Sequence, residues 1–225
     1  MTTSPPRKRI AFYGGSFDPI HLGHFAVAKA LLGQFGLDEF VFIPASHAPH
    51  KLRKAPTSTY DRYAMLCLAT HNESNIRVSR MEIEMPDRPY SVETLSRLNE
   101  ELSNVEIFFV MGADSWTDIT TWREWEKVLS LSNHIVVSRP GYQIGTGHVT
   151  DDTRLRIVDL RGQNHVADVP NSAHGITRSI YFTDSVNYDV SATDIRRRIR
   201  ENDDSWQRDV PIEVANYIEK YQIYK

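Results

Sequence analysis

The sequence predicts an α/β protein with a doubly wound parallel sheet and flanking helices. Short apolar, β-branched or aromatic runs alternate with amphipathic helical patterns along most of the chain. A glycine-rich turn joins the first such run to the first helical pattern, and strands linked by helices of this length form right-handed βαβ units. Ligands bind such sheets beyond the carboxyl ends of the strands, so residues at those ends are the site candidates.

Strand-like and helical segments follow one another in an order that mostly alternates. The strand segments are short and rich in Ile, Val, Phe and Tyr, whereas the helical segments repeat apolar residues three and four positions apart. We expect strands at residues 9–13, 39–43, 105–111, 134–138, 154–160 and 179–182. We expect helices at residues 22–35, 58–70, 92–102, 122–131, 192–201 and 212–221.

This pattern predicts a single domain over residues 9–225, a size that can bury a sizeable core. Residues 1–8 are charged and no apolar stretch follows them, so we expect a flexible tail and not a secretory signal. Residues 141–176 are rich in Gly, Asn, Asp and His and are expected to form a long loop or an insertion. Residues 190–225 are expected to be a helical C-terminal part.

The composition narrows the function classes. The net charge of −3 argues against an extended surface for nucleic acid. A single cysteine, Cys67, excludes an internal disulfide framework and fits a reducing compartment. No apolar stretch is long enough to cross a bilayer, so we expect a cytoplasmic protein with no membrane partner. The oligomeric state stays open, and a homo-oligomer is one option.

The most informative segment reads Gly-Gly-Ser-Phe-Asp-Pro-Ile-His-Leu-Gly-His at residues 14–24. Between a strand and a helix, glycines let backbone N–H groups approach a phosphate, and the helix N-terminus adds partial positive charge. His21 and His24 are three residues apart and would share one helix face. Capping or surface exposure would explain two histidines alone, but the combined pattern indicates a polyphosphate site. Its candidate residues are Gly14, Gly15, Ser16, Phe17, Asp18, His21 and His24.

Zinc is the alternative explanation for these histidines. His21 and His24 could join His47 and His50 as imidazole ligands. However, neither a cysteine pair nor a His-Glu-x-x-His spacing accompanies them, and a zinc site would leave the glycines without a purpose. We therefore predict no metal held by the protein's own side chains.

Other charged and aromatic candidates follow the later predicted strands. Lys51 lies in a proline-containing loop and is suited to a phosphate, although a solvated lysine would also explain it. Asp114 follows the strand at 105–111, and Arg139 follows the strand at 134–138. Trp116 and Trp122 have the pattern of core residues, but one of them could cover a flat ring.

The last candidates lie at the start of the helix predicted at residues 192–201. Ser191 and Asp194 have the spacing of an N-cap and a capping-box partner, which explains both structurally. Arg196 in the first turn opposes the helix dipole, a cost that a bound phosphate would reverse. A structural role and a phosphate-binding role both stay open here.

In this order, these segments resemble the bacterial nicotinate-nucleotide adenylyltransferases, members of the nucleotidyltransferase superfamily with a Rossmann-like fold. The resemblance spans residues 9–139 and 190–221. It rests on the motif at 14–24, Pro-His-Lys at 49–51, Tyr-Ser-Val-Glu-Thr-Leu at 90–95, Gly-Ala-Asp at 112–114, Trp122, Arg-Pro-Gly at 139–141 and Ser-Ala-Thr-Asp-Ile-Arg at 191–196. The chain departs from the family pattern at Pro89, at Ala192 and in a longer connection between residues 139 and 190.

The resemblance implies transfer of AMP from ATP to nicotinate mononucleotide, giving deamido-NAD and pyrophosphate, with Mg²⁺ carried on ATP. The catalytic residues that it implies are His21, His24, Lys51 and Arg196. The ATP-binding residues that it implies are Gly14, Gly15, Ser16, Phe17, Asp18, Gly112, Asp114, Arg139 and Ser191. For the nicotinate mononucleotide it implies Tyr90, Ser91, Thr94 and Trp122, with the tryptophan stacked on the pyridine ring and the Tyr90–Ser91 backbone at its carboxylate.

The expected chemistry agrees with these residue types. The attacking phosphate is already anionic near neutral pH, because its second pKa is about 6, so no general base is required. Catalysis would come from positioning and from stabilising charge on the α-phosphate and the departing pyrophosphate. Two alternatives remain: another phosphate acceptor, such as nicotinamide mononucleotide, and a non-catalytic nucleotide-binding module.

Overall fold

Seven parallel strands form one sheet in the order β3-β2-β1-β4-β5-β7-β6. The computed structural model describes residues 7–46, 57–85, 89–138, 144–163, 178–186 and 188–225. The strands are β1 (Lys8–Gly15), β2 (Glu39–Pro44), β3 (Ile76–Val78), β4 (Val105–Gly112), β5 (Asn133–Val137), β6 (Ile157–Asp159) and β7 (Ile180–Thr183). The chain builds outward from β1 to β3 and then returns to the centre at β4. The strand order therefore reverses between β1 and β4, and the predicted doubly wound sheet is confirmed.

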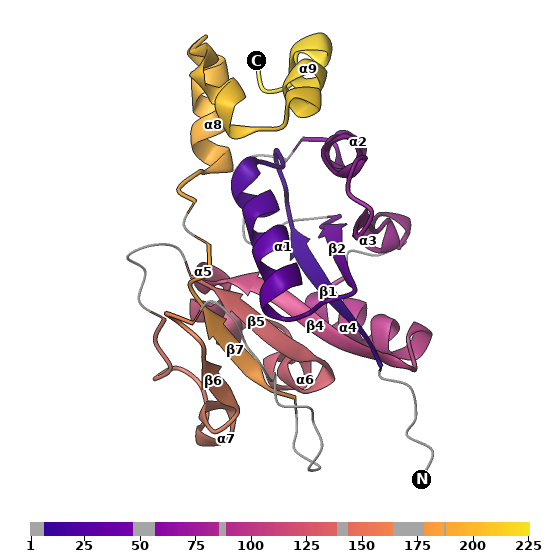
Figure 1. Cartoon of the computed structure of the whole chain (residues 1–225), viewed down its shortest axis with the longest axis vertical. Helices are drawn as coiled ribbons and strands as arrows, with labels where there is room; N and C mark the ends of the chain where they lie inside the picture. The colour runs from indigo at the N-terminus through magenta and orange to yellow at the C-terminus, as the bar shows by residue number, and fades with distance from the viewer. Residues whose placement is uncertain (1–6, 47–56, 86–88, 139–143, 164–177, 187) are drawn as a thin grey trace.

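Helices connect the strands and lie on both sides of the sheet (Figure 1). The α-helices are α1 (Leu22–Gln34), α2 (Thr59–Thr70), α3 (Met81–Glu84), α4 (Ser91–Glu101), α5 (Ala113–Thr117), α6 (Trp125–Leu131), α7 (Asp151–Arg154), α8 (Ala192–Arg200) and α9 (Ile212–Tyr221). The 3-10 helices are η1 (Ile119–Thr121) and η2 (Asp204–Asp209). None of the described helices is long and apolar enough to cross a membrane.

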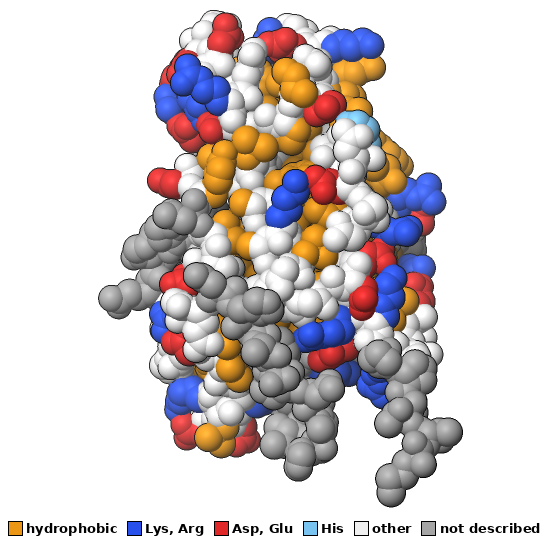
Figure 2. Space-filling model, viewed as in Figure 1, with side chains coloured by type: hydrophobic (Ala, Val, Ile, Leu, Met, Phe, Trp, Pro, Cys, Tyr) orange, Lys and Arg blue, Asp and Glu red, His pale blue; other side chains and the backbone are white. Residues whose placement is uncertain are grey.

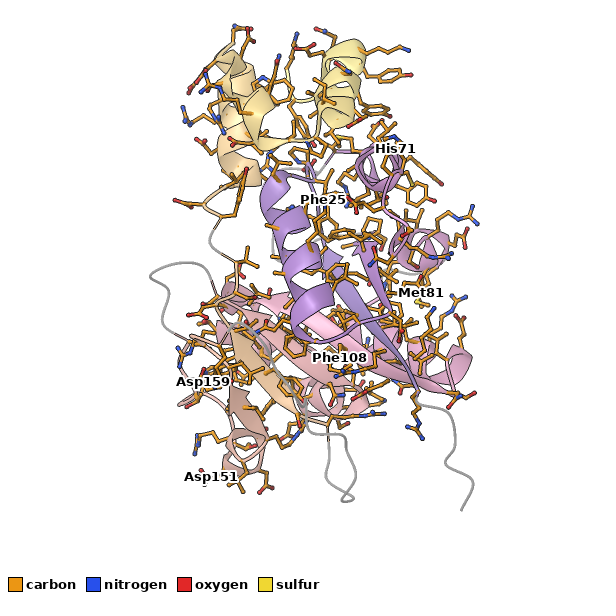
Figure 3. All side chains as sticks on the ribbon, in the orientation of Figure 1. Phe25, His71, Met81, Phe108, Asp151 and Asp159 are labelled. Carbon is orange, nitrogen blue, oxygen red and sulfur yellow. The ribbon has the colours of Figure 1, made fainter. Side chains whose placement is uncertain are left out.

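Successive side chains of each strand point to opposite faces of the sheet, so the core has two layers, one on each face. Ile10 and Phe12 of β1 belong to the layer that contains α4, α5 and α6, whereas Ala11 between them belongs to the layer of α1 and α2. Figure 3 labels Phe25 and Phe108, which both lie in the α1 layer. Both faces of the central strands are thus buried, as is usual in a parallel sheet.

The C-terminal helices α8 and α9 stand beyond the carboxyl end of β1, away from the N-terminus (Figure 1). Hydrophobic residues of both helices, including Ile195 and Ile218, join the α1 layer of the core. The hydroxyl group of Tyr217 in α9 donates to Asp61 Oδ1 in α2 at 2.8 Å. Residues 190–225 therefore pack against the α1 side of the fold, beyond the carboxyl end of β1.

Several predicted boundaries are corrected. The strand predicted at 154–160 is shorter in the structure, where β6 covers only Ile157–Asp159 because α7 continues to Arg154. The helix predicted from Trp122 begins at Trp125, since Glu124 adopts a left-handed backbone with a φ of 49°. The short β3, α3 and α5 were not predicted, because three to five residues are too few to show a periodicity.

The segment predicted as a loop at 141–176 is partly regular where it is described. Thr150 caps α7 by accepting a hydrogen bond from Thr153 N, and Ile144 and Val149 are buried. Trp116 Nε1 donates to Gly145 O at 2.8 Å, which ties this segment to the core. Residues 141–143 and 164–176 of this segment fall outside the described part of the chain.

Candidate functional site

A cavity of about 730 Å³ lies across the carboxyl ends of the central strands. Its floor includes Gly14 at the end of β1, Met111 in β4 and Val137 in β5, with Ala45 following β2. These ends are level, because Tyr13 pairs with Phe42 on one side and with Val110 on the other. The cavity thus occupies the point where the strand order reverses, the usual place for a ligand in such a sheet.

Most of the predicted site residues line this one cavity. They are Gly14, Gly15, Ser16, Phe17, His21, His24, Tyr90, Ser91, Gly112, Asp114 and Trp122. Four predicted site residues lie in the described part of the chain but do not line the cavity: Asp18, Thr94, Ser191 and Arg196. Lys51 and Arg139 lie outside the described residues, so the structure does not place them.

The glycine-rich turn is packed around the ring of Phe17. Phe17 is 2% exposed and has a φ of 46°, a left-handed backbone that a bulky residue adopts only where its surroundings enforce it. A Cβ on Gly15 would lie 2.9 Å from this ring, which real contacts do not allow. Gly15 is therefore required at least for packing, whereas the sequence interpretation gave a phosphate as its reason.

The two histidines form a stacked pair at the start of α1. The ring centroids of His21 and His24 are 3.7 Å apart with an angle of 26° between the planes. His21 N donates to His24 Nδ1 at 3.3 Å, so a neutral His24 carries its proton on Nε2. His24 can thus offer an N–H donor to a ligand without gaining charge.

Asp18 and Arg196 hold the turn from outside the cavity. Asp18 Oδ1 accepts a hydrogen bond from the hydroxyl group of Tyr224 at 2.7 Å, and Arg196 Nη1 donates to Asp18 O. Thr57 N donates to the other carboxylate oxygen of Asp18. In this structure both residues therefore fix the backbone that carries Phe17.

The capping-box interpretation of Ser191 is wrong. Ser191 occupies the N-cap position of α8, but its side chain makes no capping hydrogen bond. Asp194 instead forms ion pairs with Arg197 and Arg198 on the same helix. Figure 2 shows the result as a group of basic side chains bordered by acidic ones over α8.

Arg62 of α2 supports the turn and was not predicted from the sequence. It is 1% exposed, and its guanidinium donates to Ser16 O at 2.6 Å, Ala45 O at 2.7 Å and Thr57 O at 3.0 Å. Burial lowers its pKa, and Asp18 nearby acts in the opposite direction. A signal existed in the sequence: Arg62 shares an apolar face with Met65 and Leu66, at helical spacing, where a cation needs partners.

The opposite side of the cavity carries Asp114 and Trp122. Asp114 lies in the first turn of α5, and its Oδ1 accepts from Ser115 N at 2.9 Å. A Cβ on Gly112 would lie 2.5 Å from that same oxygen, so a larger residue there would require the Asp114 carboxylate to move. Trp122 lines the cavity, whereas Trp116 is fully buried in the core, so the open choice between the two tryptophans falls on Trp122.

Tyr90 is the N-cap of α4, lines the same cavity as Trp122 and contacts two charged residues. Its backbone N–H donates to Glu93 Oε2 at 2.9 Å. The guanidinium carbon of Arg123 lies 5.2 Å from the centroid of the Tyr90 ring, in a cation–π arrangement. Arg123 also lines the cavity, although no basic residue of this region was predicted from the sequence.

Glu82 of α3 is a further lining residue that the sequence did not reveal. Its Oε1 accepts a hydrogen bond from Thr94 Oγ1 at 2.8 Å, so Thr94 reaches the cavity wall through Glu82. Burial raises the pKa of Glu82 to about 7, despite the opposing effect of that hydrogen bond. Figure 3 labels Met81, the preceding residue at the start of α3.

Glu82 should make the protein less stable as the pH rises from about 5 to about 8. The pKa of Glu82 is higher in the folded protein than in the unfolded chain, so the folded state binds the extra proton between the two values and loses this advantage above about 7. Glu82→Gln removes the titration and keeps an acceptor for Thr94. The melting temperatures of the wild type and of Glu82→Gln should converge at low pH, and the variant should have the higher melting temperature at high pH. Parallel curves would contradict this.

The fold and the site together define a nucleotide-binding α/β protein of the nucleotidyltransferase class. The model of the Cytidylyltransferase-like family matches residues 12–198. The chain is 35% identical, over 100% of both chains, to a protein of Desulfitobacterium hafniense strain Y51 described as a probable nicotinate-nucleotide adenylyltransferase. It is 33% identical to a protein of Corynebacterium glutamicum with the same description, covering 100% of this chain and 93% of the relative.

The chain therefore belongs to the cytidylyltransferase-like family and, within it, to the nicotinate-nucleotide adenylyltransferases. Solved structures agree on the fold. Nicotinic acid mononucleotide adenylyltransferase of Plasmodium falciparum complexed with NaAD has a TM-score of 0.70 at 20% identity, covering 96% of this chain and 97% of that one. The same protein complexed with APC has a TM-score of 0.68 with equal coverage.

Proposed function

We propose that this enzyme transfers AMP from ATP to nicotinate mononucleotide, giving deamido-NAD and pyrophosphate in NAD biosynthesis. One observation carries the proposal. The glycine-rich turn with its histidines and the Tyr90–Trp122 region line a single cavity, so two nucleotides can meet in one space. The names of the relatives, matched over the whole chain, support the same reaction.

In this proposal the residues of the turn serve ATP and its leaving pyrophosphate. His24 offers its Nε2–H to a phosphate oxygen, and His21 lies against it. Lys51, Arg139 and Ser191 remain proposed phosphate contacts on the resemblance alone. Asp114 in the first turn of α5 would accept from the ribose hydroxyls. The donors stabilise the charge that develops as the α-phosphate is attacked.

The acceptor would lie against Trp122. An indole that lines the cavity can stack on a pyridine ring, and Tyr90, Ser91 and the Glu82–Thr94 pair would surround that ring. The acceptor's phosphate arrives ionised, with a second pKa of about 6, and attacks the α-phosphorus without a base. The bond to pyrophosphate breaks as the new P–O bond forms.

We also propose that Mg²⁺ enters with ATP. The described residues contain no group of three His, Cys, Asp or Glu side chains that could hold a metal ion, so this part of the protein offers no cage. Bound to the phosphate oxygens, the ion neutralises negative charge that would repel the acceptor. We further propose that residues 9–225 form a single domain and that the protein is cytoplasmic.

Pyrophosphate release with ATP across a panel of acceptors tests the proposal directly. We expect nicotinate mononucleotide to give the highest kcat/KM, ahead of nicotinamide mononucleotide, with pantetheine phosphate inactive. A strong preference for nicotinamide mononucleotide would replace the proposed substrate. Binding of ATP with no pyrophosphate release for any acceptor would indicate the non-catalytic module instead.

A further inference from the structure

The cavity must accept anionic nucleotides, yet the acidic residues in its wall outnumber the basic ones. Glu82, Asp114 and Asp118 all belong to the described lining. Of the lining residues that the structure describes, Arg123 is the one lysine or arginine. It directly follows Trp122, so the positive charge lies at the acceptor end of the cavity. An anionic group bound beside Trp122 would find its nearest described counter-charge there.

Arg123 is held in place by two residues from the start of α4. Its guanidinium carbon lies 5.2 Å from the Tyr90 ring centroid, and its Nη1 lies 3.2 Å from Glu93 Oε1. Its Nε also lies 3.9 Å from Glu124 Oε1. The side chain is still 56% exposed, and a guanidinium has five N–H donors, more than these two ion pairs use. The group is thus oriented in advance and keeps donors for a further carboxylate.

The backbone of Tyr90 is less available to a ligand. The resemblance assigns the Tyr90–Ser91 backbone to the acceptor's carboxylate, but Tyr90 N–H already donates to Glu93 Oε2 at 2.9 Å. A ligand would have to displace that carboxylate, which also engages Arg123. The side chain of Arg123 can bind a ligand without that loss.

We propose that Arg123 is a specificity-determining residue that binds the carboxylate on the acceptor's pyridine ring. The inference rests on the proposed function, because it places that ring against Trp122. A planar guanidinium binds a carboxylate through charge-assisted hydrogen bonds, whereas a neutral carboxamide gains no ionic attraction from it. Arg123 therefore favours nicotinate mononucleotide over nicotinamide mononucleotide, and its loss removes the preference.

The test compares kcat/KM for the two mononucleotides in Arg123→Gln. We expect the ratio of nicotinate to nicotinamide to fall roughly 10- to 100-fold, the effect of losing a hydrogen bond between charged groups. The loss should appear mainly in KM for nicotinate mononucleotide, since the interaction is present before the reaction. Arg123→Lys keeps the charge but not the planar fork, so its ratio should be intermediate.

Two further variants separate recognition from a structural effect. Lys127→Gln on α6 removes a nearby cation that also pairs with Glu124 but does not line the cavity, and its ratio should equal that of the wild type. Glu93→Gln breaks the ion pair with Arg123 while glutamine can still cap α4. If Arg123 binds the ligand, Glu93→Gln should keep or increase the preference for nicotinate.

Each outcome decides between the possibilities. A ratio that is unchanged in Arg123→Gln, or that falls equally in Lys127→Gln or in Glu93→Gln, overturns the role of Arg123 and leaves the proposed function standing. Wild-type enzyme that releases no pyrophosphate with nicotinate mononucleotide overturns the proposed function itself. The wild-type measurement therefore tests the proposed function, and the variant measurements test the role of Arg123.

Discussion

Replacing His24 by alanine should lower kcat for pyrophosphate release by about 100- to 1,000-fold, the usual cost of removing one donor that stabilises transition-state charge. His24 lines the cavity at the start of α1, and its Nδ1 accepts the backbone N–H of His21. Alanine removes the ring N–H at Nε2, and with it the Nδ1 acceptor and the ring that stacks on His21. Steady-state kinetics with saturating ATP and acceptor measures the effect, and a thermal melt checks that the protein is folded.

His71→Ala is the matched control for this prediction. His71 ends α2 outside the cavity lining, and its Nδ1 contacts Leu68 O at 2.7 Å. This variant should keep the wild-type kcat. His24→Gln should recover part of the loss, because its amide carries an N–H donor at about the reach of Nε2. Near-normal turnover in His24→Ala would refute the proposed role of the histidines.

Replacing Arg62 by alanine should destabilise the folded protein by about 3–5 kcal/mol, among the larger effects of a single substitution. The guanidinium is fully buried and donates to three backbone carbonyls, those of Ser16, Ala45 and Thr57. Alanine leaves these acceptors without their donor in a place that water reaches poorly. The melting temperature should fall by roughly 10 °C for a chain of this size. Denaturant unfolding followed by circular dichroism gives the free energy.

Arg77→Ala gives the reference for losing an ordinary arginine. Arg77 in β3 pairs with Glu39 at 2.8 Å, but its side chain is 70% exposed, so the loss should be below about 1 kcal/mol. Arg62→Lys keeps the charge but cannot reach three carbonyls in one plane, so its stability should lie between those of the wild type and Arg62→Ala. Equal stability of Arg62→Ala and Arg77→Ala would show that the buried hydrogen bonds contribute little.

The sequence predicted the parts of this site that come from one continuous segment. The turn at residues 14–24 has its own composition, and its place after β1 follows from the order of strands and helices. The roles of Arg62 and Glu82 were not predicted, because their partners are distant in sequence. Arg62 forms a hydrogen bond with Ser16, and Glu82 forms one with Thr94. No local pattern encodes a contact that only the folded chain creates.

Asp18 shows the same limit within a predicted motif. Its residue type suggested a ligand contact, yet its carboxylate is engaged by Tyr224. Arg123 was missed for the opposite reason, since an exposed arginine in a Trp-Arg-Glu sequence has the composition of an ordinary surface.

The bonds that hold Asp18 also set when the site can form during folding. They join residues 178 and 206 positions apart, to Arg196 and to Tyr224. Closing such long loops is entropically costly, so we expect these contacts to form late, after the local β1–α1–β2 unit. The turn would then acquire its final shape only when α8 and α9 dock. A nucleotide bound to that shape would in turn favour the docked state, which couples substrate binding to the last step of assembly.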